Sequence, residues 1–216
     1  MKVIEVLNLD EATEVARSIF IDITPEKRKK VAFTGGRFGE QVLSKLSIDD
    51  LTSDYEIFQT DERFVNPNDD DCIQTLIINE LFNLSVPNKN RVNFFSIDTD
   101  VKTSVNMMTN TLNSKRVDAL DVVFLSLGED GHMAGHFRNS LITDDNRICY
   151  TENAIKLPKK RISYNVSWLF KSKLIILCAI GPDKEKAYNE LFNAEGLHSE
   201  FITNQETLIL LKDKNY

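Results

Sequence analysis

The sequence predicts an α/β fold: a mostly parallel sheet with helices on both faces. Short apolar runs typical of buried strands alternate along the chain with segments whose apolar residues recur at helical spacing. Strands that alternate with helices favour parallel pairing, with the helices packed on the two faces of the sheet. The 216 residues contain no repeat, low-complexity tract or linker, so we expect a single domain over residues 1–216.

The N-terminal half begins with a strand expected at residues 2–7. Asp10 is suited to cap the helix that follows, because Asp is a preferred residue at helix N-termini. This helix places four apolar residues on one face, namely Ala12, Val15, Ala16 and Ile19. The next expected elements are a strand at 31–34, a helix with Val42, Leu43 and Leu46 facing inward, a strand at 55–59 and an apolar helix at 72–82.

The C-terminal half continues the alternation. The expected elements are a strand at 92–96, a helix at 100–112, a central strand at 122–127, an alternating stretch from Arg161, a strand at 173–179, a helix opened by Gly181-Pro182-Asp183 and a final strand at 207–211. The loop at 66–71 is rich in turn residues.

Composition narrows the class of partner. The 42% apolar and 27% charged residues are ordinary for a globular protein. The net charge of −7 argues against a nucleic-acid binder, although a few placed cations and backbone N–H groups are enough to bind a small anion. No apolar run approaches the length of a membrane span, so no membrane partner is expected.

The cysteines and the N-terminus indicate the compartment. Cys72, Cys149 and Cys178 are far apart and unpaired in spacing, which is typical of reduced thiols rather than a disulfide framework. The first residues carry charges within their apolar stretch and lack a cleavage pattern. We therefore expect a cytoplasmic protein; the oligomeric state stays open.

The most informative motif is Gly128-Glu129-Asp130-Gly131-His132, which directly follows the apolar run at 122–127. Open α/β sheets bind ligands at the carboxyl ends of their strands, and this motif places two carboxylates and an imidazole there. His132 is one of only three histidines, and imidazole titrates near neutrality. A functional His132 is therefore favoured over a histidine that only satisfies a turn.

Other strand ends carry polar residues as well. Gly35-Gly36-Arg37 follows one expected strand, Asp61-Glu62-Arg63 follows the next, and a fourth contribution comes from Gly181 and Lys184. Because parallel strands point the same way, their C-terminal loops meet at one edge of the sheet. We expect these residues to converge with the His132 motif.

Each of these segments has a functional and a structural interpretation. Gly35 and Gly36 before a helix suit a phosphate, with Arg37 as a guanidinium ligand, but they also suit a tight turn. The Asp61 to Arg63 segment is either a site or a solvated charge cluster. Lys184 stands near a helix start, where the dipole disfavours a cation, which suggests a nearby anion.

A metal site is the alternative for His132, because His136 follows four residues later and would share a helix face with it. The Glu that usually stands beside the first His of such a motif is missing, as is a third ligand. We therefore predict no metal, and the simpler interpretation of His136 is an ordinary residue on a helix surface.

The combined motifs resemble the 6-phosphogluconolactonase family, in the superfamily that includes the glucosamine-6-phosphate deaminases. The specific pieces are Asp61-Glu62-Arg63-Phe64-Val65 and Gly128-Glu129-Asp130-Gly131-His132-Met133-Ala134, supported by Thr34-Gly35-Gly36, Arg161-Ile162-Ser163 and Gly181-Pro182-Asp183-Lys184. The resemblance runs in order through nearly the whole chain. It implies a Rossmann-like α/β/α fold and hydrolysis of 6-phospho-D-glucono-1,5-lactone to 6-phospho-D-gluconate in the oxidative pentose phosphate pathway.

The resemblance also assigns expected roles. His132 matches the general base, Asp61 and Arg63 match an active-site acid and arginine, and Arg161 and Lys184 match phosphate-associated basic residues. A lactone carbonyl is itself an electrophile, so no redox cofactor is expected.

Three further roles follow from the mechanism that we expect. Either Asp130 or Asp61 orients the imidazole. The oxyanion is stabilised by backbone N–H groups between Gly128 and Gly131, or by Arg63. The 6-phosphate is held by Gly36, Arg37, Arg161 and Lys184.

The chain departs from the family pattern at three places. Arg37-Phe38-Gly39 replaces Ser-Thr-Pro, Cys72-Ile73 replaces Ser-Asn, and the segment after His132 is altered up to residue 139. A noncatalytic sugar-phosphate binder therefore stays open as an alternative. A deaminase usually ends its second motif in Asp-Glu-Tyr, so Arg63 favours the lactonase.

Overall fold

The structure, a computed structural model, describes residues 1–22, 29–46, 55–82, 91–202 and 205–216. In its first half the elements are β1 (Lys2–Val6), α1 (Leu9–Asp22), β2 (Lys30–Phe33), α2 (Gly36–Lys45), β3 (Glu56–Gln59), β4 (Asp61–Arg63), α3 (Ile73–Phe82), β5 (Val92–Asn93) and α4 (Val101–Ser114). The remaining elements are β6 (Val122–Ser126), β7 (Leu141–Ile142), β8 (Ile148–Thr151), β9 (Arg161–Tyr164), α5 (Val166–Leu169), β10 (Leu174–Ala179), the short 3-10 helix η3 (Pro182–Lys184), α6 (Glu185–Phe192), α7 (Ser199–Ile202) and β11 (Leu208–Asp213).

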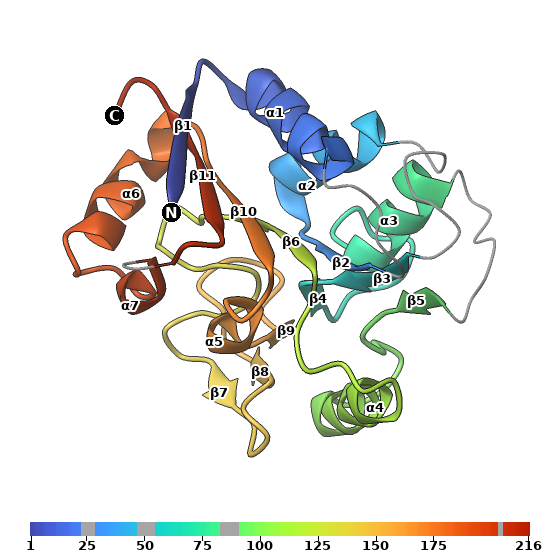
Figure 1. The fold of residues 1–216 in the computed structure, drawn as a ribbon. Helices are drawn as coiled ribbons and strands as arrows, with labels where there is room; N and C mark the ends of the chain where they lie inside the picture. The colour runs from blue at the N-terminus through green and yellow to red at the C-terminus, as the bar shows by residue number, and fades with distance from the viewer. Residues whose placement is uncertain (23–28, 47–54, 83–90, 203–204) are drawn as a thin grey trace.

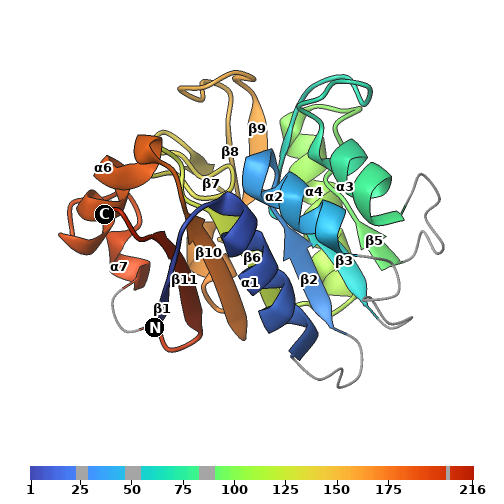
Figure 2. The same ribbon diagram turned by 90° about the horizontal axis from the view of Figure 1, so that it is seen from above.

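A seven-stranded sheet in the order β1-β11-β10-β6-β2-β3-β5 forms the centre of the molecule (Figure 1). Every neighbouring pair in it is parallel. Alternate residues of its strands face opposite ways, so that Val31 and Phe33 pack into one apolar cluster and Ala32 into the other. The first cluster includes residues of α1, α2 and α3, and the second includes residues of α4 to α7. The predicted parallel sheet with both faces covered is confirmed (Figure 2).

The order of the strands reverses between β2 and β6, which are paired neighbours. From β2 the chain builds outward through β3 and β5, whereas from β6 it builds the other way through β10 and β11. The loops that leave β2 and β6 therefore diverge and open a crevice at the carboxyl ends of the strands, which is where ligands bind in open α/β sheets. This reversal brings the loop at Gly35 near the loop at Gly128.

A second sheet, antiparallel and in the order β4-β9-β8-β7, lies beside the first. Asp61, Glu62 and Arg63 form its strand β4, so the sequence interpretation of these residues as a loop was wrong. In the register of β4 and β9, Arg63 stands opposite Arg161. The sheet was not predicted because strands of two to four residues are too short to carry a clear alternation.

The start of α1 also differs from expectation. The side chain of Asn8 accepts a hydrogen bond from the Glu11 N–H at 2.9 Å, and the Glu11 carboxylate accepts one from the Leu7 N–H at 2.6 Å. This arrangement resembles a capping box, except that the Glu11 carboxylate binds the N–H of Leu7, one residue before the cap Asn8. Asp10 lies inside the first turn, where its charge favours the helix dipole without capping it.

Residues 128–140 follow β6 as a series of turns rather than as a helix. Met133 forms isolated bridges with Leu127 and with His136, which fold this loop back on itself. The predicted helix face shared by His132 and His136 is therefore wrong. Strand β5 is likewise shorter than the expected strand at 92–96. Across the residues that the structure describes, no helix has the length and apolar character needed to cross a bilayer.

His136 packs against a second buried histidine instead. Its ring centroid lies 4.8 Å from that of His198, whose Nε2–H donates to the His136 carbonyl at 3.1 Å. The Val166 N–H donates to His136 Nδ1 at 3.3 Å. Burial, together with the nearby charge of His136, lowers the pKa of His198 from 6.5 to about 4. The folded protein therefore keeps this pair of rings neutral at neutral pH.

We predict that acid weakens the fold through His198. At a pH between 6.5, the ordinary pKa of histidine, and about 4, the pKa of His198 in the folded protein, this side chain is protonated in the unfolded chain but neutral in the native one. The free energy of unfolding then falls as pH drops through this window, by up to about 3 kcal/mol. Urea denaturation at pH 7.5, 6 and 4.5 measures this loss. In the His198→Gln variant, which keeps an N–H donor but does not titrate, the loss is smaller; equal pH slopes contradict the prediction.

Candidate functional site

A cavity of about 460 Å³ opens at the carboxyl ends of the central strands, between the loops that leave β2 and β6. Its size is in the range of small-molecule sites. The structure brings together most of the residues that the sequence singled out, since all of them except Asp130 and Gly131 line this cavity. These lining residues are Gly35, Gly36, Arg37, Asp61, Arg63, Gly128, His132, Arg161 and Lys184.

The imidazole of His132 is held by Asp130. Its Nδ1 lies in short hydrogen-bond contact with the Asp130 Oδ1, and both side chains are largely buried. The ring also stacks on Phe137, with centroids 4.3 Å apart and planes 24° apart. Because a carboxylate can only accept, Nδ1 carries the hydrogen and the neutral ring leaves Nε2 unprotonated. Of the two carboxylates considered from the sequence, the observed contact is with Asp130.

Burial opposes ionisation of Asp130, but the hydrogen bond and the charge of His132 outweigh it. The pKa of the Asp130 carboxyl is therefore below its ordinary value. An ionised Asp130 stabilises positive charge on the imidazole, so the pair can accept a proton at Nε2 and return it.

Gly128 makes room for this imidazole. A Cβ at Gly128 would collide with the Nδ1 and Cε1 atoms of His132, and would lie 2.9 Å from the Asp130 Oδ1. Any residue with a side chain there would displace the ring or its carboxylate. The glycine after β6 is therefore required by close approach of His132.

Two backbone N–H groups of the loop after β6 form hydrogen bonds within the loop itself. The Gly128 N–H donates to the His132 carbonyl at 2.8 Å, and the Gly131 N–H donates to the Gly128 carbonyl at 3.1 Å. Gly131 lies in the turn behind the cavity wall, so the structure does not place it where it would touch a ligand. These two N–H groups, expected as oxyanion donors, are engaged within the turn.

The three residues of β4 contact different parts of the molecule. Asp61 is 3% exposed, lines the cavity and accepts a hydrogen bond from Thr60 Oγ1 at 2.7 Å. Glu62 points away and accepts from the N–H groups of Ile73 and Gln74, at 3.0 and 2.7 Å, which begin helix α3. Burial raises the pKa of Glu62, although these hydrogen bonds oppose the rise. Glu62 therefore anchors α3 rather than facing the cavity.

Arg63, unlike Glu62, lines the cavity. Its guanidinium is in short contact with the Asp71 carboxylate and also donates to the Asp71 carbonyl at 3.1 Å. Its Nε is buried and makes no hydrogen bond. Asp71 thus fixes the direction of a cation that still has an unsatisfied donor.

Lys184 is a buried cation without a carboxylate contact in the described structure. Its Nζ donates to Ser126 Oγ at 2.8 Å. Burial lowers its pKa, and the positive charges of Arg37 and Lys156 add to this effect, against the opposing influence of Cys178 and Asp183. A bound anion would offset both the burial and the repulsion, so this end of the cavity favours negative charge.

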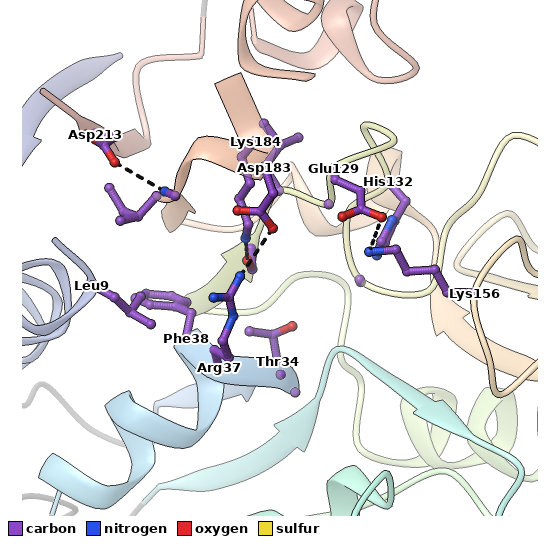
Figure 3. A pocket seen from close by; sticks show the side chains of 18 of the residues that line it. Leu9, Thr34, Arg37, Phe38, Glu129, His132, Lys156, Asp183, Lys184 and Asp213 are labelled. Atoms are coloured by element: carbon purple, nitrogen blue, oxygen red, sulfur yellow. Dashed lines mark hydrogen bonds and ion pairs between the residues drawn. The ribbon is translucent and has the colours of Figure 1, made fainter. Parts of the chain in front are cut away.

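Arg37 lies at the mouth of the cavity, where it pairs with Asp183 at 3.2 Å and stays 72% exposed (Figure 3). It follows Gly35 and Gly36, which start helix α2. Gly36 has a φ of +70°, a conformation that residues with a Cβ rarely adopt. The N-terminus of α2 therefore faces the cavity with glycines, a backbone arrangement suited to an anion.

Arg161 is less available than expected. Its Nε donates to the Pro158 carbonyl at 3.0 Å and its NH2 group to the Leu157 carbonyl at 2.9 Å. The guanidinium lies over Phe137, 5.4 Å from the ring centroid. Burial and the charge of Arg63 lower its pKa. Arg161 therefore fixes the connection between β8 and β9 while adding positive charge to the wall.

The sequence missed several residues that line the cavity. Lys156 comes from the connection between β8 and β9, and its Nζ lies 2.8 Å from the Glu129 carboxylate (Figure 3). Asp183 and Asp213 also contribute, the latter by accepting from the Gly181 N–H at 3.3 Å. Lys156 stands in a long connection rather than directly after a strand, so no local pattern pointed to it.

The rings of His132 and His136 pack against different side chains: His132 stacks on Phe137, and His136 lies against His198. Over the ranges that the structure describes, no three His, Cys, Asp or Glu side chains are grouped in a way that could hold a metal ion.

We predict that Gly128→Ala destabilises the protein by about 3 kcal/mol, the upper end of ordinary overpacking, because its Cβ collides with His132. Gly36→Ala is the matched control: it strains the backbone at φ +70° but meets no atom within 4 Å, and costs about 1 kcal/mol. Denaturant unfolding of the two variants measures both. A Gly128→Ala protein as stable as Gly36→Ala contradicts this packing.

Comparison with known proteins shows the family to which the chain belongs. Residues 6–209 match the family described as glucosamine-6-phosphate isomerases/6-phosphogluconolactonase. A 6-phosphogluconolactonase of Borreliella burgdorferi is 30% identical over 176 residues, which cover 77% of this chain and 74% of that protein. A glucosamine-6-phosphate deaminase of Malacoplasma penetrans is 29% identical over 135 residues, covering 54% and 55% of the two chains.

The fold agrees with this match. The crystal structure of a 6-phosphogluconolactonase from Thermotoga maritima superposes with a TM-score of 0.83 over 98% of each chain, at 21% identity. That likeness concerns the fold, and the sequence match extends over almost the whole chain. The chain therefore belongs to the family of glucosamine-6-phosphate isomerases and 6-phosphogluconolactonases.

Proposed function

We propose that this protein hydrolyses 6-phospho-D-glucono-1,5-lactone to 6-phospho-D-gluconate, the lactone-opening step of the oxidative pentose phosphate pathway. The observation that carries the proposal is the His132–Asp130 pair: His132 lines the cavity, and its Nδ1 is committed to the Asp130 carboxylate behind it. The family includes both lactonases and deaminases, and Arg63 after Asp61-Glu62 favours the lactonase.

The reaction needs a base that acts on water. Nε2 of neutral His132 takes a proton from a water molecule while its oxygen attacks C1 of the lactone. The tetrahedral intermediate then expels the ring oxygen, and the imidazolium returns its proton to that oxygen as the C1–O bond breaks. The carboxylic acid formed at C1 ionises in solution, so one water is consumed and one proton released.

Arg63 is the residue of the wall that we assign to the developing oxyanion. Its guanidinium is positioned by Asp71 and keeps one buried donor unsatisfied. A fixed cation in a partly dehydrated site stabilises the charge that appears at the carbonyl oxygen. Asp61, from the same strand, supplies a buried carboxylate on the same wall.

We assign the phosphate to the part of the cavity that Lys184, Arg37 and the start of α2 line. Lys184, Arg37 and the backbone at Gly35 and Gly36 supply a buried cation, an exposed cation and a helix start. Arg161 contributes charge but has two donors committed to carbonyls, so we assign it mainly to holding the neighbouring connection. Anchoring the phosphate fixes the distance from C1 to His132.

A stopped-flow assay of lactone opening, corrected for spontaneous hydrolysis, tests the proposal directly. Acceleration by the purified protein supports the lactonase. Ammonia release from glucosamine 6-phosphate, with no lactone opening, would instead identify a deaminase. Binding of 6-phosphogluconate without either reaction would identify a noncatalytic sugar-phosphate binder, the alternative raised by the altered Arg37-Phe38-Gly39 segment.

We predict that His132→Ala lowers kcat for lactone opening by about 10²–10⁴-fold, the usual contribution of a general base. Binding of 6-phosphogluconate changes little, because the phosphate is held by other residues. Turnover comes from the same stopped-flow assay and affinity from calorimetry. Wild-type kcat in a folded His132→Ala protein would exclude His132 as the base.

For the phosphate end we predict that Lys184→Met raises KM about tenfold to a hundredfold, as expected for loss of a charged hydrogen bond, with a smaller change in kcat. Lys186→Met is the matched control, because Lys186 is 84% exposed and pairs only weakly with Glu190 at 3.5 Å. Steady-state kinetics of the two variants decide the matter, and an unchanged KM in Lys184→Met would remove Lys184 from the phosphate site.

A further inference from the structure

The ion pair between Glu129 and Lys156 takes no part in the proposed lactone hydrolysis. Both residues line the cavity, and their charged atoms are 2.8 Å apart. Glu129 belongs to the same short loop as His132, whereas Lys156 belongs to the connection between β8 and β9. The pair therefore links the loop of the proposed base to a separate segment on the cavity wall (Figure 3).

The segment that carries Lys156 is firmly held. Arg161 donates to the carbonyls of the next two residues, Leu157 and Pro158. The Lys156 side chain itself is 42% exposed and that of Glu129 47% exposed. Half-exposed ion pairs are weak, so another carboxylate can replace Glu129 on Lys156, at a cost of up to about fivefold in its affinity.

The proposed reaction produces such a carboxylate. C1 of the lactone carries no charge, but hydrolysis converts it to an anion, and C1 reacts at the wall that holds His132. The other cations of the cavity have competing contacts: Arg37 with Asp183, Arg63 with Asp71, Arg161 with backbone carbonyls, and Lys184 with Ser126. Lys156 is paired with the acid that belongs to the base's own loop.

We propose that Glu129 competes with the carboxylate of the product for Lys156, and so lets the site discriminate between its uncharged substrate end and its charged product end. The inference rests on the proposed lactonase function. While the lactone is bound, Glu129 stays on Lys156. After ring opening the new carboxylate reaches Lys156 only by displacing Glu129, which lowers the affinity for product and favours its release.

Calorimetry with two ligands tests the proposal. 6-Phosphogluconate carries the carboxylate, and glucose 6-phosphate carries the same phosphate on a closed ring without it. In Glu129→Gln we expect 6-phosphogluconate to bind about threefold to fivefold more tightly, the scale of a partly exposed ion pair. The affinity for glucose 6-phosphate stays within about twofold, since no carboxylate gains access to Lys156.

A double-mutant cycle shows whether Lys156 is the cation for which Glu129 and the product carboxylate compete. In a Lys156→Gln background, Glu129→Gln no longer tightens 6-phosphogluconate binding, because there is no cation to release. Glu190→Gln is the control, since Glu190 pairs with Lys186 and does not line the cavity. It leaves both affinities unchanged.

Three results would overturn the inference: equal tightening of both ligands in Glu129→Gln, no tightening of either, or the same tightening without Lys156. The stopped-flow assay of the wild-type protein separates these failures from failure of the proposed function. Lactone opening with no effect of Glu129→Gln removes only the inference. A wild-type protein that binds neither ligand removes both.

Discussion

The hydrogen bond between Nδ1 of His132 and the Asp130 carboxylate decides which nitrogen of the imidazole is free to act as a base. Two local conditions allow it. Gly128 has no Cβ to occupy the space of the ring, and Phe137 covers one face of the imidazole. The loop carrying all of these groups leaves β6 where the strand order reverses. The sheet topology thus places His132 in the crevice, and the carboxylate sets the tautomer of its neutral ring.

The cations that line the cavity differ in how tightly their partners hold them. Arg63 is fixed by Asp71, whereas Arg37 has only an exposed ion pair with Asp183. Lys184 donates to a hydroxyl, and its burial lowers its pKa. Tight pairs fix geometry, and loose pairs can exchange partners with a ligand. On this basis the buried cations are suited to positioning, and the half-exposed Lys156 is suited to discrimination between ligands.

Sequence predicted the central sheet well because its inner strands are buried on both faces and form continuous apolar runs, as at 122–127. It also pointed to His132, which lines the cavity, since a histidine after a strand and a glycine is a local signal. It could not choose Asp130 over Asp61, because that choice depends on the turn that follows Gly128. Lys156 was missed, and the contacts of Arg161 with backbone carbonyls could not be foreseen, because only tertiary structure shows the partners of these residues.

Nitrogen-15 NMR of the imidazole rings tests the central claim most directly. The chain has three histidines, so the His132 signals can be assigned by their loss in His132→Gln. At a pH where the ring is neutral, we predict a protonated Nδ1 and an unprotonated Nε2 for His132, with the Nδ1 proton signal altered in Asp130→Asn. A neutral ring protonated at Nε2 would contradict the account, because it could not take a proton from water at that atom.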